Sequence, residues 1–195
     1  WKTVREQLEK RNSKDTVFCP DMTEWIGKSQ LCYDRLYAGL ETYCGQIGGT
    51  FHLCGLSLGG ILALQYSAAH PERVKSLIVI GTQYKMPKAL LRLQNGIFRL
   101  LPDSGFQNMG FGKKQVIQLS KSMMDLDLTG NLKQITCPTL ILCGEKDWLN
   151  WPASRRLEKA IPHANAERIL HAGHEVNKEN ADDAGEKMRK FLETV

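Results

Sequence analysis

Apolar residues along the chain follow two alternating patterns. Short runs that are apolar on both faces predict buried strands, and they lie at 16–22, 51–55, 74–82, 139–144 and within 164–172. Apolar residues at helical spacing predict helices at 1–11, 29–45, 59–70, 151–161 and 181–195. Strands of this kind, alternating with helices, are typical of parallel sheets covered on both sides. The sequence therefore predicts an α/β fold, a mostly parallel sheet flanked by helices on both faces.

Residues 83–133 interrupt this alternation. They hold helical patterns at 89–101 and 114–124 and no convincing strand. We interpret 83–133 as a helical cap or lid, inserted into a core formed by 1–82 and 134–195. Between residues 84 and 121 there are seven basic residues and one acidic residue, whereas the whole chain carries a net charge of +5. A solvated helix face explains this excess, and attraction of an anionic substrate or partner is the functional alternative.

Composition narrows the class of protein. The 195 residues are 42% hydrophobic and 24% charged, which suits one domain with a sizeable core. No apolar stretch approaches the roughly 20 residues of a membrane span, and the basic segment has too few aromatic residues to favour nucleic acid. None of the six cysteines forms a CxxC pair or has zinc-ligand spacing with His. We interpret them as reduced, buried thiols and expect a cytoplasmic protein without a metal site.

Residues 51–60 read FHLCGLSLGG, which places Ser57 between a predicted strand and a predicted helix. A serine on a sharp strand-to-helix turn projects its hydroxyl beyond the sheet, and its strained backbone requires small neighbours. Gly55 and Gly59 meet that requirement, two residues before and two after. The N–H groups of the first helical turn then converge where an anion is favoured. The alternative is an ordinary glycine turn.

A nucleophilic serine needs a base, and the base needs an orienting acid. Asp147 follows the strand 139–144, and His174 lies in the glycine-bearing turn after the next strand. Because the carboxyl ends of parallel strands meet at one edge of a sheet, we expect these side chains to converge with Ser57. Weaker alternatives are Glu145 and Asp125 for the acid and His171 for the base.

The motifs GLSLGG, CPTLILCGEKD and HAGHE, followed by a terminal helix, resemble the α/β-hydrolase superfamily. The likeness is to its branch of small, esterase-like serine hydrolases with a helical cap, and it spans residues 51–195. The resemblance implies that Ser57 is the nucleophile, Asp147 the orienting acid and His174 the general base. It also implies that the backbone N–H of Leu58 is one oxyanion donor.

In this family a loop that contains His and Gly supplies the second oxyanion donor, and a further strand lies between the counterparts of 16–22 and 51–55. Trp1 resembles the start of the family's first helix, so we expect the early strands and this loop to lie upstream of Trp1. Two alternatives stay open: another segment or chain fills the slot, or a truncated form rearranges its sheet. Loss of one oxyanion donor costs about 100- to 1000-fold in turnover, so we expect the segment from Trp1 alone to be a poor enzyme.

The sequence thus predicts a serine hydrolase that cleaves an ester or thioester of a small or medium acyl group without a cofactor. The basic segment favours an anionic substrate. Trp148, Phe98 and Met86 are candidates for substrate contact, although packing explains them equally well. Two other functions remain: a lyase or C–C bond hydrolase that uses the same triad on an anionic substrate, and a hydrolase-like binding module without catalysis.

Overall fold

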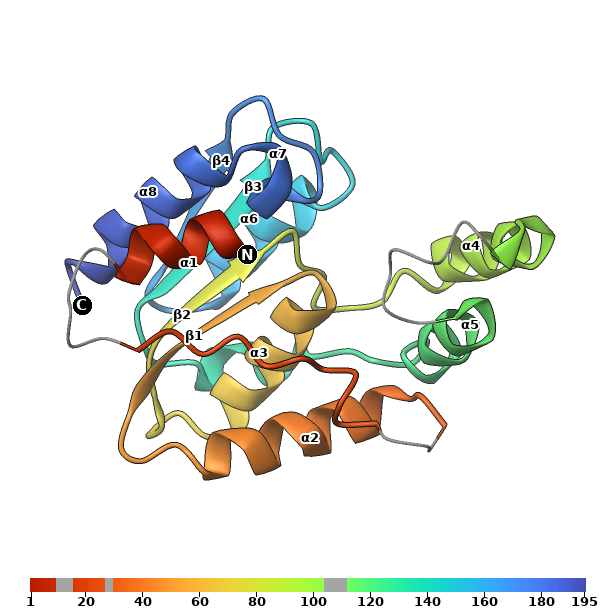
Figure 1. Ribbon diagram of the computed structural model, residues 1–195, viewed down its shortest axis with the longest axis horizontal. Coiled ribbons are helices and arrows are strands. Elements are labelled where there is room, and N and C mark those ends of the chain that lie inside the picture. The colour runs from red at the N-terminus through yellow and green to blue at the C-terminus, as the bar shows by residue number, and fades with distance from the viewer. Residues whose placement is uncertain (10–15, 27–29, 104–111) are drawn as a thin grey trace. The chain divides into compact units, whose positions relative to one another are not determined.

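Figure 1 shows the computed structural model, which describes residues 1–9, 16–26, 30–103 and 112–195. The described chain divides into two compact units. The first comprises Trp1–Cys19, Gly48–Tyr84 and Leu128–Val195, and the second comprises Pro20–Ile47 and Lys85–Asp127. Segment 83–133 therefore contributes most of its residues to the second unit, together with a stretch from the first quarter of the chain.

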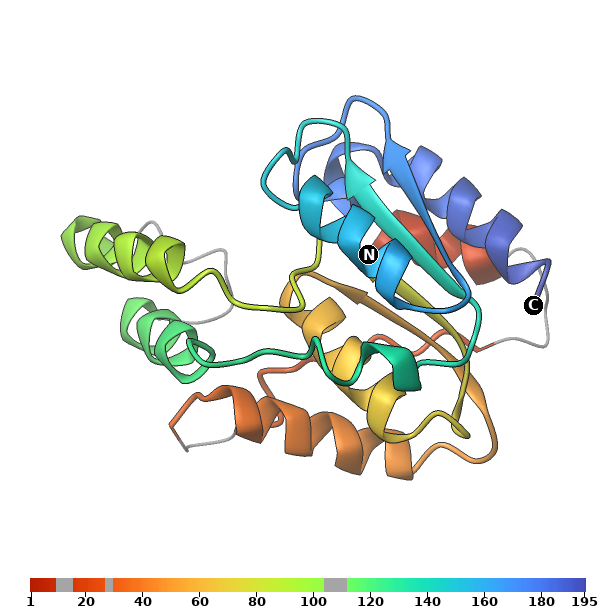
Figure 2. The same cartoon turned by 180° about the vertical axis from the view of Figure 1, so that it is seen from behind.

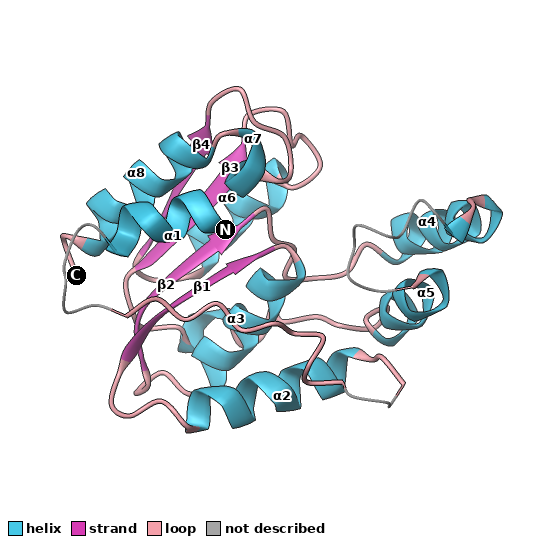
Figure 3. Cartoon of the chain, viewed as in Figure 1, coloured by secondary structure: helices cyan, strands magenta, loops and turns pink. Residues whose placement is uncertain are grey.

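A four-stranded parallel sheet forms the centre of the first unit (Figure 3). Its strands β1 (Phe51–Leu56), β2 (Val74–Ile80), β3 (Thr139–Gly144) and β4 (Ala164–Ile169) lie in the order β1-β2-β3-β4. Leu56 pairs with Ile80, and Gly144 pairs with Ile169, so the strands end at a common edge. This arrangement confirms the predicted parallel sheet, and it brings the loops after all four strands to one side.

Helices cover both faces of this sheet. α1 (Lys2–Glu9) and α8 (Ala181–Leu192) lie on the face turned toward the viewer in Figure 1, with the short α7 (Val176–Glu179) before α8. Figure 2 shows α6 (Trp151–Ala160) on the opposite face, where α3 (Leu58–Ala69) and the 3-10 turn η2 (Leu132–Gln134) also pack. Ile78 and Ile80 of β2 join the core beneath α1 and α8. Alternation along the strand directs Leu77 and Val79, also buried, to the other face.

The second unit is helical. It contains α2 (Tyr33–Gly45), α4 (Lys88–Leu100) and α5 (Lys113–Ser122). The backbone N–H of Tyr33 donates to Ser122 Oγ over 2.9 Å and connects α2 with the end of α5. Cys32 occupies the position before α2, whereas Ser29, where the predicted helix 29–45 begins, lies outside the described residues.

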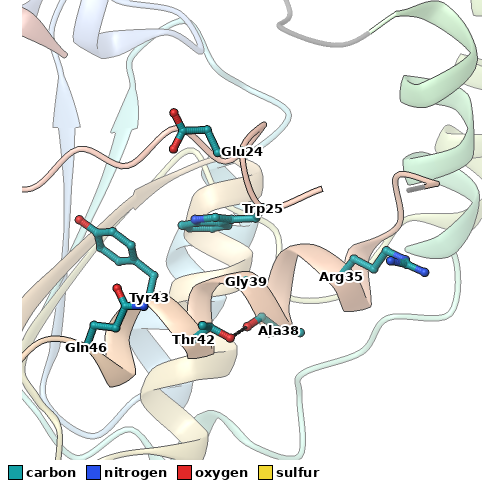
Figure 4. A pocket seen from close by; sticks show the side chains of 8 residues that line it. All are labelled: Glu24, Trp25, Arg35, Ala38, Gly39, Thr42, Tyr43 and Gln46. Atoms are coloured by element: carbon teal, nitrogen blue, oxygen red, sulfur yellow. Dashed lines mark hydrogen bonds between the residues drawn. The ribbon is translucent and has the colours of Figure 1, made fainter. Parts of the chain in front are cut away.

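An open hollow of about 560 Å³ lies beside α2 in this unit. Figure 4 shows Trp25 and Tyr43 along it, and their ring centroids are 6.0 Å apart. A Cβ added to Gly39 would lie 2.5 Å from Trp25 Cβ, so this glycine allows the indole to approach the helix. The hollow is lined by Glu24, Trp25, Arg35, Ala38, Gly39, Thr42, Tyr43 and Gln46. None of the predicted catalytic residues is among them.

Two expectations from the sequence are wrong: that residues 16–22 form a strand, and that all six cysteines are buried. Residues 16–22 form no strand. A strand is stable only where a neighbour accepts its ladder of hydrogen bonds, but no strand of the described sheet pairs with this segment, and Phe18 is exposed. Cys19 and Cys54 are also exposed rather than buried, although all six cysteines are free. Cys54 belongs to β1, which is the end strand of the sheet.

Candidate active site

Ser57 is the only residue between the end of β1 and the start of α3. Its backbone has φ 53° and ψ −114°, in the left-handed region that costs an L-residue roughly 1–2 kcal/mol. Two backbone hydrogen bonds hold the turn. The N–H of Ser57 donates to the carbonyl of Ile80 over 2.8 Å, and the carbonyl of Ser57 accepts from the N–H of Ile61 over 3.1 Å. The predicted strand–turn–helix is therefore present, with a strained serine at its apex.

The glycines around Ser57 differ in what they allow. A Cβ on Gly55 would collide with the backbone of Gly59, so the position two residues before Ser57 must be glycine, in agreement with the expected small residue. A Cβ on Gly59 itself would meet no neighbouring atom within 4 Å, so the expectation that this position must be small for steric reasons is wrong. The second crowded position is Gly60, where a Cβ would collide with the side chain of Thr82. The backbone of Gly59 occupies the space next to Gly55, and the lack of a side chain at Gly59 plays no part in this contact.

Leu58 begins α3, directly after the serine. The first four N–H groups of a helix have no acceptor within it, and the helix dipole makes this end favourable for negative charge. The Leu58 N–H is thus suited to receive an oxyanion that forms beside Ser57.

Asp147 and His174 approach each other after β3 and β4. His174 Nδ1 lies 2.7 Å from Asp147 Oδ2. A carboxylate only accepts hydrogen bonds, so Nδ1 carries the proton and donates it, which leaves a lone pair on Nε2 of the neutral ring. The side chain of Asp147 is 6% exposed and that of His174 is 42% exposed. The acid is therefore buried behind an accessible imidazole, in the arrangement that general-base chemistry requires.

The two groups change each other's proton affinity. Burial raises the pKa of Asp147, but hydrogen bonds from His174 and Asn150 outweigh it and hold that pKa below its usual range. The hydrogen bond to Asp147 raises the pKa of His174, against a smaller opposing effect of burial. The carboxylates of Glu175 and Glu179 raise it further. The pair is thus organised around an ionised acid that supports positive charge on the ring.

Gly81 connects this pair with the serine turn. It follows Ile80, the residue whose carbonyl accepts from Ser57. Gly81 has φ 54°, and a Cβ added there would lie 3.1 Å from His174 Nδ1 and 3.3 Å from Asp147 Oδ2. The end of β2 therefore contacts the serine turn through one residue and the acid–base pair through the next.

The alternative acid and base candidates have other partners. The His171 side chain is 85% exposed, and the backbone N–H of His171 donates to Glu145 Oε2 over 2.9 Å. Asp125 belongs to the second unit and pairs with Lys88 at 2.5 Å.

The three substrate-contact candidates occupy different surroundings. Trp148 directly follows Asp147 and is 74% exposed, as a residue available for contact should be. Met86 is buried, and Phe98 lies half-buried on α4; both belong to the second unit. Substrate contact stays a prediction for all three.

Sequence reasoning missed two amide side chains that are linked to Asp147, Asn150 directly and Gln83 through Asn150. Asn150 Nδ2 lies 2.9 Å from each carboxylate oxygen of Asp147, and Gln83 Nε2 donates to Asn150 Oδ1 over 2.8 Å. The Pro at the start of α6 marks Asn150 as a helix-start position, but no sequence signal identifies Gln83.

Among the described residues, no group of three or more His, Cys, Asp or Glu is placed to hold a metal ion. Within the same residues, no helix is both long and apolar enough to cross a membrane.

Known proteins resemble this chain at low identity. The "Putative carbamate hydrolase RutD" of Yersinia enterocolitica is 23% identical over 174 residues, which are 73% of this chain and 63% of that protein. The "Putative 2-succinyl-6-hydroxy-2,4-cyclohexadiene-1-carboxylate synthase" of Bacillus subtilis is 24% identical over 180 residues, 73% of this chain and 66% of that protein. The chain thus spans about three fifths of the length of the carbamate hydrolase relative.

Solved structures share the fold. A thermophilic esterase from Thermogutta terrifontis superposes with a TM-score of 0.75 at 24% identity, over 100% of this chain and 84% of that one. NosK from Streptomyces actuosus gives a TM-score of 0.78 at 18% identity, over 98% and 91% of the two chains. The sequence model of the alpha/beta hydrolase family matches residues 1–184, and this chain therefore belongs to that family.

Proposed function

We propose that this chain carries the catalytic machinery of a serine hydrolase that cleaves a carboxylic ester or thioester through an acyl-enzyme. The contact between His174 Nδ1 and Asp147 Oδ2, at 2.7 Å, carries the proposal. It is supported by the left-handed backbone of Ser57 and by Gly81, which links the serine turn to this pair.

In the proposed reaction, Ser57 Oγ attacks the carbonyl carbon of the ester while His174 Nε2 takes its proton. The C–O or C–S bond of the substrate then breaks, and His174 returns the proton to the leaving alcohol or thiol. Water attacks the acyl-enzyme by the same route and releases the acid. Asp147 stays ionised throughout and stabilises the imidazolium, in agreement with its low pKa.

The negative charge that develops on the carbonyl oxygen requires donors. We assign the Leu58 N–H as one of them, because it opens α3 and has no acceptor within the helix. A single donor of this kind is worth about 100- to 1000-fold in turnover. A second donor is expected from the loop with His and Gly that the family resemblance implies.

The substrate is proposed to be a small molecule with an acyl group of small or medium size. The basic residues between 84 and 121 favour an anionic one. Trp148, Phe98 and Met86 are proposed as contacts, with 83–133 acting as a cap. Six free cysteines favour a reducing compartment such as the cytoplasm.

Hydrolysis of p-nitrophenyl esters of increasing acyl length, by the full-length protein and its Ser57→Ala variant, tests this proposal. We expect Ser57→Ala to abolish turnover and labelling by a fluorophosphonate probe. Thioesters and carbamates in the same panel would define the bond that is cleaved. Wild-type turnover by Ser57→Ala would remove this serine from the reaction.

Matched neighbours serve as controls for the other two residues. His174→Ala and Asp147→Asn should lose most of the turnover, whereas His171→Ala and Glu145→Gln, on the same two loops, should retain it. Equal losses in both pairs would mean that the loops, rather than the His174–Asp147 pair, limit activity.

A second candidate function keeps the triad but is that of a lyase or a C–C bond hydrolase on an anionic substrate. The Bacillus subtilis synthase relative and the basic segment favour it. Salt-sensitive rates on anionic substrates without esterase activity would support this candidate. A binding module without catalysis would instead show no fluorophosphonate labelling at Ser57.

A further inference from the structure

Hydrogen bonds run through the first unit from Gln83 to the acid of the proposed triad. Gln83 Nε2 donates to Asn150 Oδ1 over 2.8 Å. Asn150 Nδ2 lies 2.9 Å from Oδ1 and 2.9 Å from Oδ2 of Asp147, and its backbone N–H lies 3.3 Å from Oδ1. Asp147 Oδ2 in turn accepts from His174. Asn150 thus contacts both carboxylate oxygens of Asp147, and Oδ2 also accepts from the imidazole of His174.

The partners of Asn150 leave only one orientation for its amide. Its oxygen faces a donor from Gln83, and its nitrogen faces two carboxylate oxygens. Turning the amide over would place its oxygen against the carboxylate and its NH2 against the NH2 of Gln83. Gln83 is held as well, since its Nε2 lies 3.4 Å from the carbonyl of Leu149. Each amide therefore fixes the next, and together they fix the plane of the carboxylate.

Asn150 also lies beside the imidazole, with Nδ2 3.3 Å from His174 Nδ1. Nδ1 donates its proton to Asp147, so two N–H groups meet here and neither accepts from the other. The amide thereby brings partial positive charge next to the ring and shares the negative charge of Asp147. Both effects oppose the gain of a second proton by His174.

The side chain of Asn150 is not used to cap the helix that it precedes. Asn150 comes directly before α6, but its side chain makes no capping hydrogen bond there. The backbone carbonyl of Asn150 accepts from the N–H of Ser154 over 2.9 Å and from its hydroxyl over 3.1 Å. These backbone contacts survive replacement by alanine, as does the backbone N–H contact to Asp147 Oδ1, so such a variant removes only the side-chain contacts to Asp147, Gln83 and His174 and leaves the helix start in place.

We propose that Asn150, oriented by Gln83, is a positioning residue that fixes the carboxylate of Asp147 toward His174 and limits the basicity of the ring. The inference rests on the proposed function, because positioning matters only if His174 acts as the base. It adds two residues, from the loop after β2 and from the start of α6, to those that the sequence suggests.

The test compares Asn150→Ala, Gln83→Ala, the double variant and Asn165→Ala in the full-length protein. Asn165 is a matched control, since its amide also donates to a carboxylate, Glu167, but on the exposed surface of β4. We expect Asn150→Ala to lower kcat up to about 100-fold with little change in KM, as for a misplaced catalytic group. Gln83→Ala should give a smaller loss, and Asn165→Ala none.

The double variant shows whether Gln83 acts through Asn150 or whether the two residues affect turnover independently. If Gln83 acts through Asn150, the double variant should be no slower than Asn150→Ala alone. Multiplied losses would overturn the assigned role of Gln83. If Asn150→Ala does not fold, Gln83→Ala still tests the inference, because it must shift activity in the same direction.

Titration of the His174 ring by NMR tests positioning without relying on turnover. We expect its midpoint to rise in Asn150→Ala, since the carboxylates of Asp147, Glu175 and Glu179 still face the ring and the opposing amide is gone. An unchanged midpoint and unchanged kcat would overturn the inference. A raised midpoint in a protein without Ser57-dependent turnover would support the positioning while the proposed function fails.

Discussion

The backbone N–H of Ser57 donates to the carbonyl oxygen of Ile80 over 2.8 Å and so connects the turn after β1 to the end of β2. The following residue, Gly81, lies against His174 and Asp147. Two consecutive residues thus contact the serine turn and the acid–base pair. Because Ile80 ends a buried central strand and Gly81 directly follows it, the geometry of the site depends on the sheet more than on the loops.

Strain at Ser57 has a measurable consequence. Its φ of 53° costs an L-residue roughly 1–2 kcal/mol, which glycine avoids, whereas glycine loses roughly 0.5–1 kcal/mol to the entropy of the unfolded chain. We therefore expect Ser57→Gly to be more stable than Ser57→Ala by up to about 1.5 kcal/mol in urea unfolding. Both variants should be inactive, because neither retains the hydroxyl.

The same two substitutions at Ser122, the last residue of α5, provide the matched control for this comparison. Both remove the hydroxyl that accepts from the Tyr33 N–H, so that loss cancels between Ser122→Gly and Ser122→Ala. Ser122 is not among the described residues with positive φ, and glycine there should be less stable than alanine by up to about 1 kcal/mol. The same order of stability at Ser57 would show that the turn stores no strain.

Gly81 should tolerate no side chain. In Gly81→Ala the new Cβ would lie 3.1 Å from His174 Nδ1 and 3.3 Å from Asp147 Oδ2, so the ring must move. We expect turnover to fall by less than the roughly 100-fold that a displacement of about 1 Å costs, because the ring needs to move by only a few tenths of an ångström. Gly49→Ala separates contact from backbone strain, because Gly49 also has positive φ but no atom near its Cβ. Both variants should lose roughly 1–2 kcal/mol of stability, and only the first should lose activity.

The sequence predicted those parts of the fold that local pattern determines. β3 is buried at every position and β2 at every position except Lys75, and the strand–serine–helix order around Ser57 is as predicted. Residues 16–22 show the limit, because their β-branched and aromatic composition permits a strand but cannot supply the neighbour that a strand requires. The Gln83–Asn150 contact shows a second limit of prediction from sequence, because it joins residues 67 positions apart through side chains that are common in any loop.

Gly55 and Gly59, two residues before and two residues after Ser57, should respond differently to replacement by alanine. A Cβ on Gly55 would collide with the backbone of Gly59, which cannot swing aside as a flexible side chain could. We expect Gly55→Ala to cost several kcal/mol, on the order of 3, and to distort the turn. Gly59→Ala should be neutral or stabilising by up to about 1 kcal/mol, because the site is open and alanine favours helix.

Unfolding midpoints of Gly55→Ala and Gly59→Ala, with far-UV circular dichroism to confirm folding, would check this difference. Equal destabilisation would mean that both glycines are needed for their backbone conformation rather than for space. The sequence pattern alone cannot separate these explanations, since it treats the two positions alike.

The His174–Asp147 contact should make stability depend on pH in a defined sense. The raised pKa of His174 gives a contribution that is complete below about 6.5, the ordinary value for His, and is lost as pH rises through the higher pKa of the folded protein. The lowered pKa of Asp147 gives a contribution that is complete above about 3.9 and is lost as pH falls through the lower folded pKa. The pair should therefore stabilise most between these two ordinary values.

Urea unfolding of the wild type, His174→Gln, Asp147→Asn and the double variant across this range measures the coupling directly. Because the ring is partly exposed and solvent screens the charges, we expect a coupling free energy on the order of 1 kcal/mol at its maximum. Glu175 and Glu179 remain in every variant, so their attraction to the ring cancels in the cycle. A coupling that does not change with pH would mean that the 2.7 Å contact joins two neutral groups, and Asp147 could then no longer be the charged partner on which the proposed base depends.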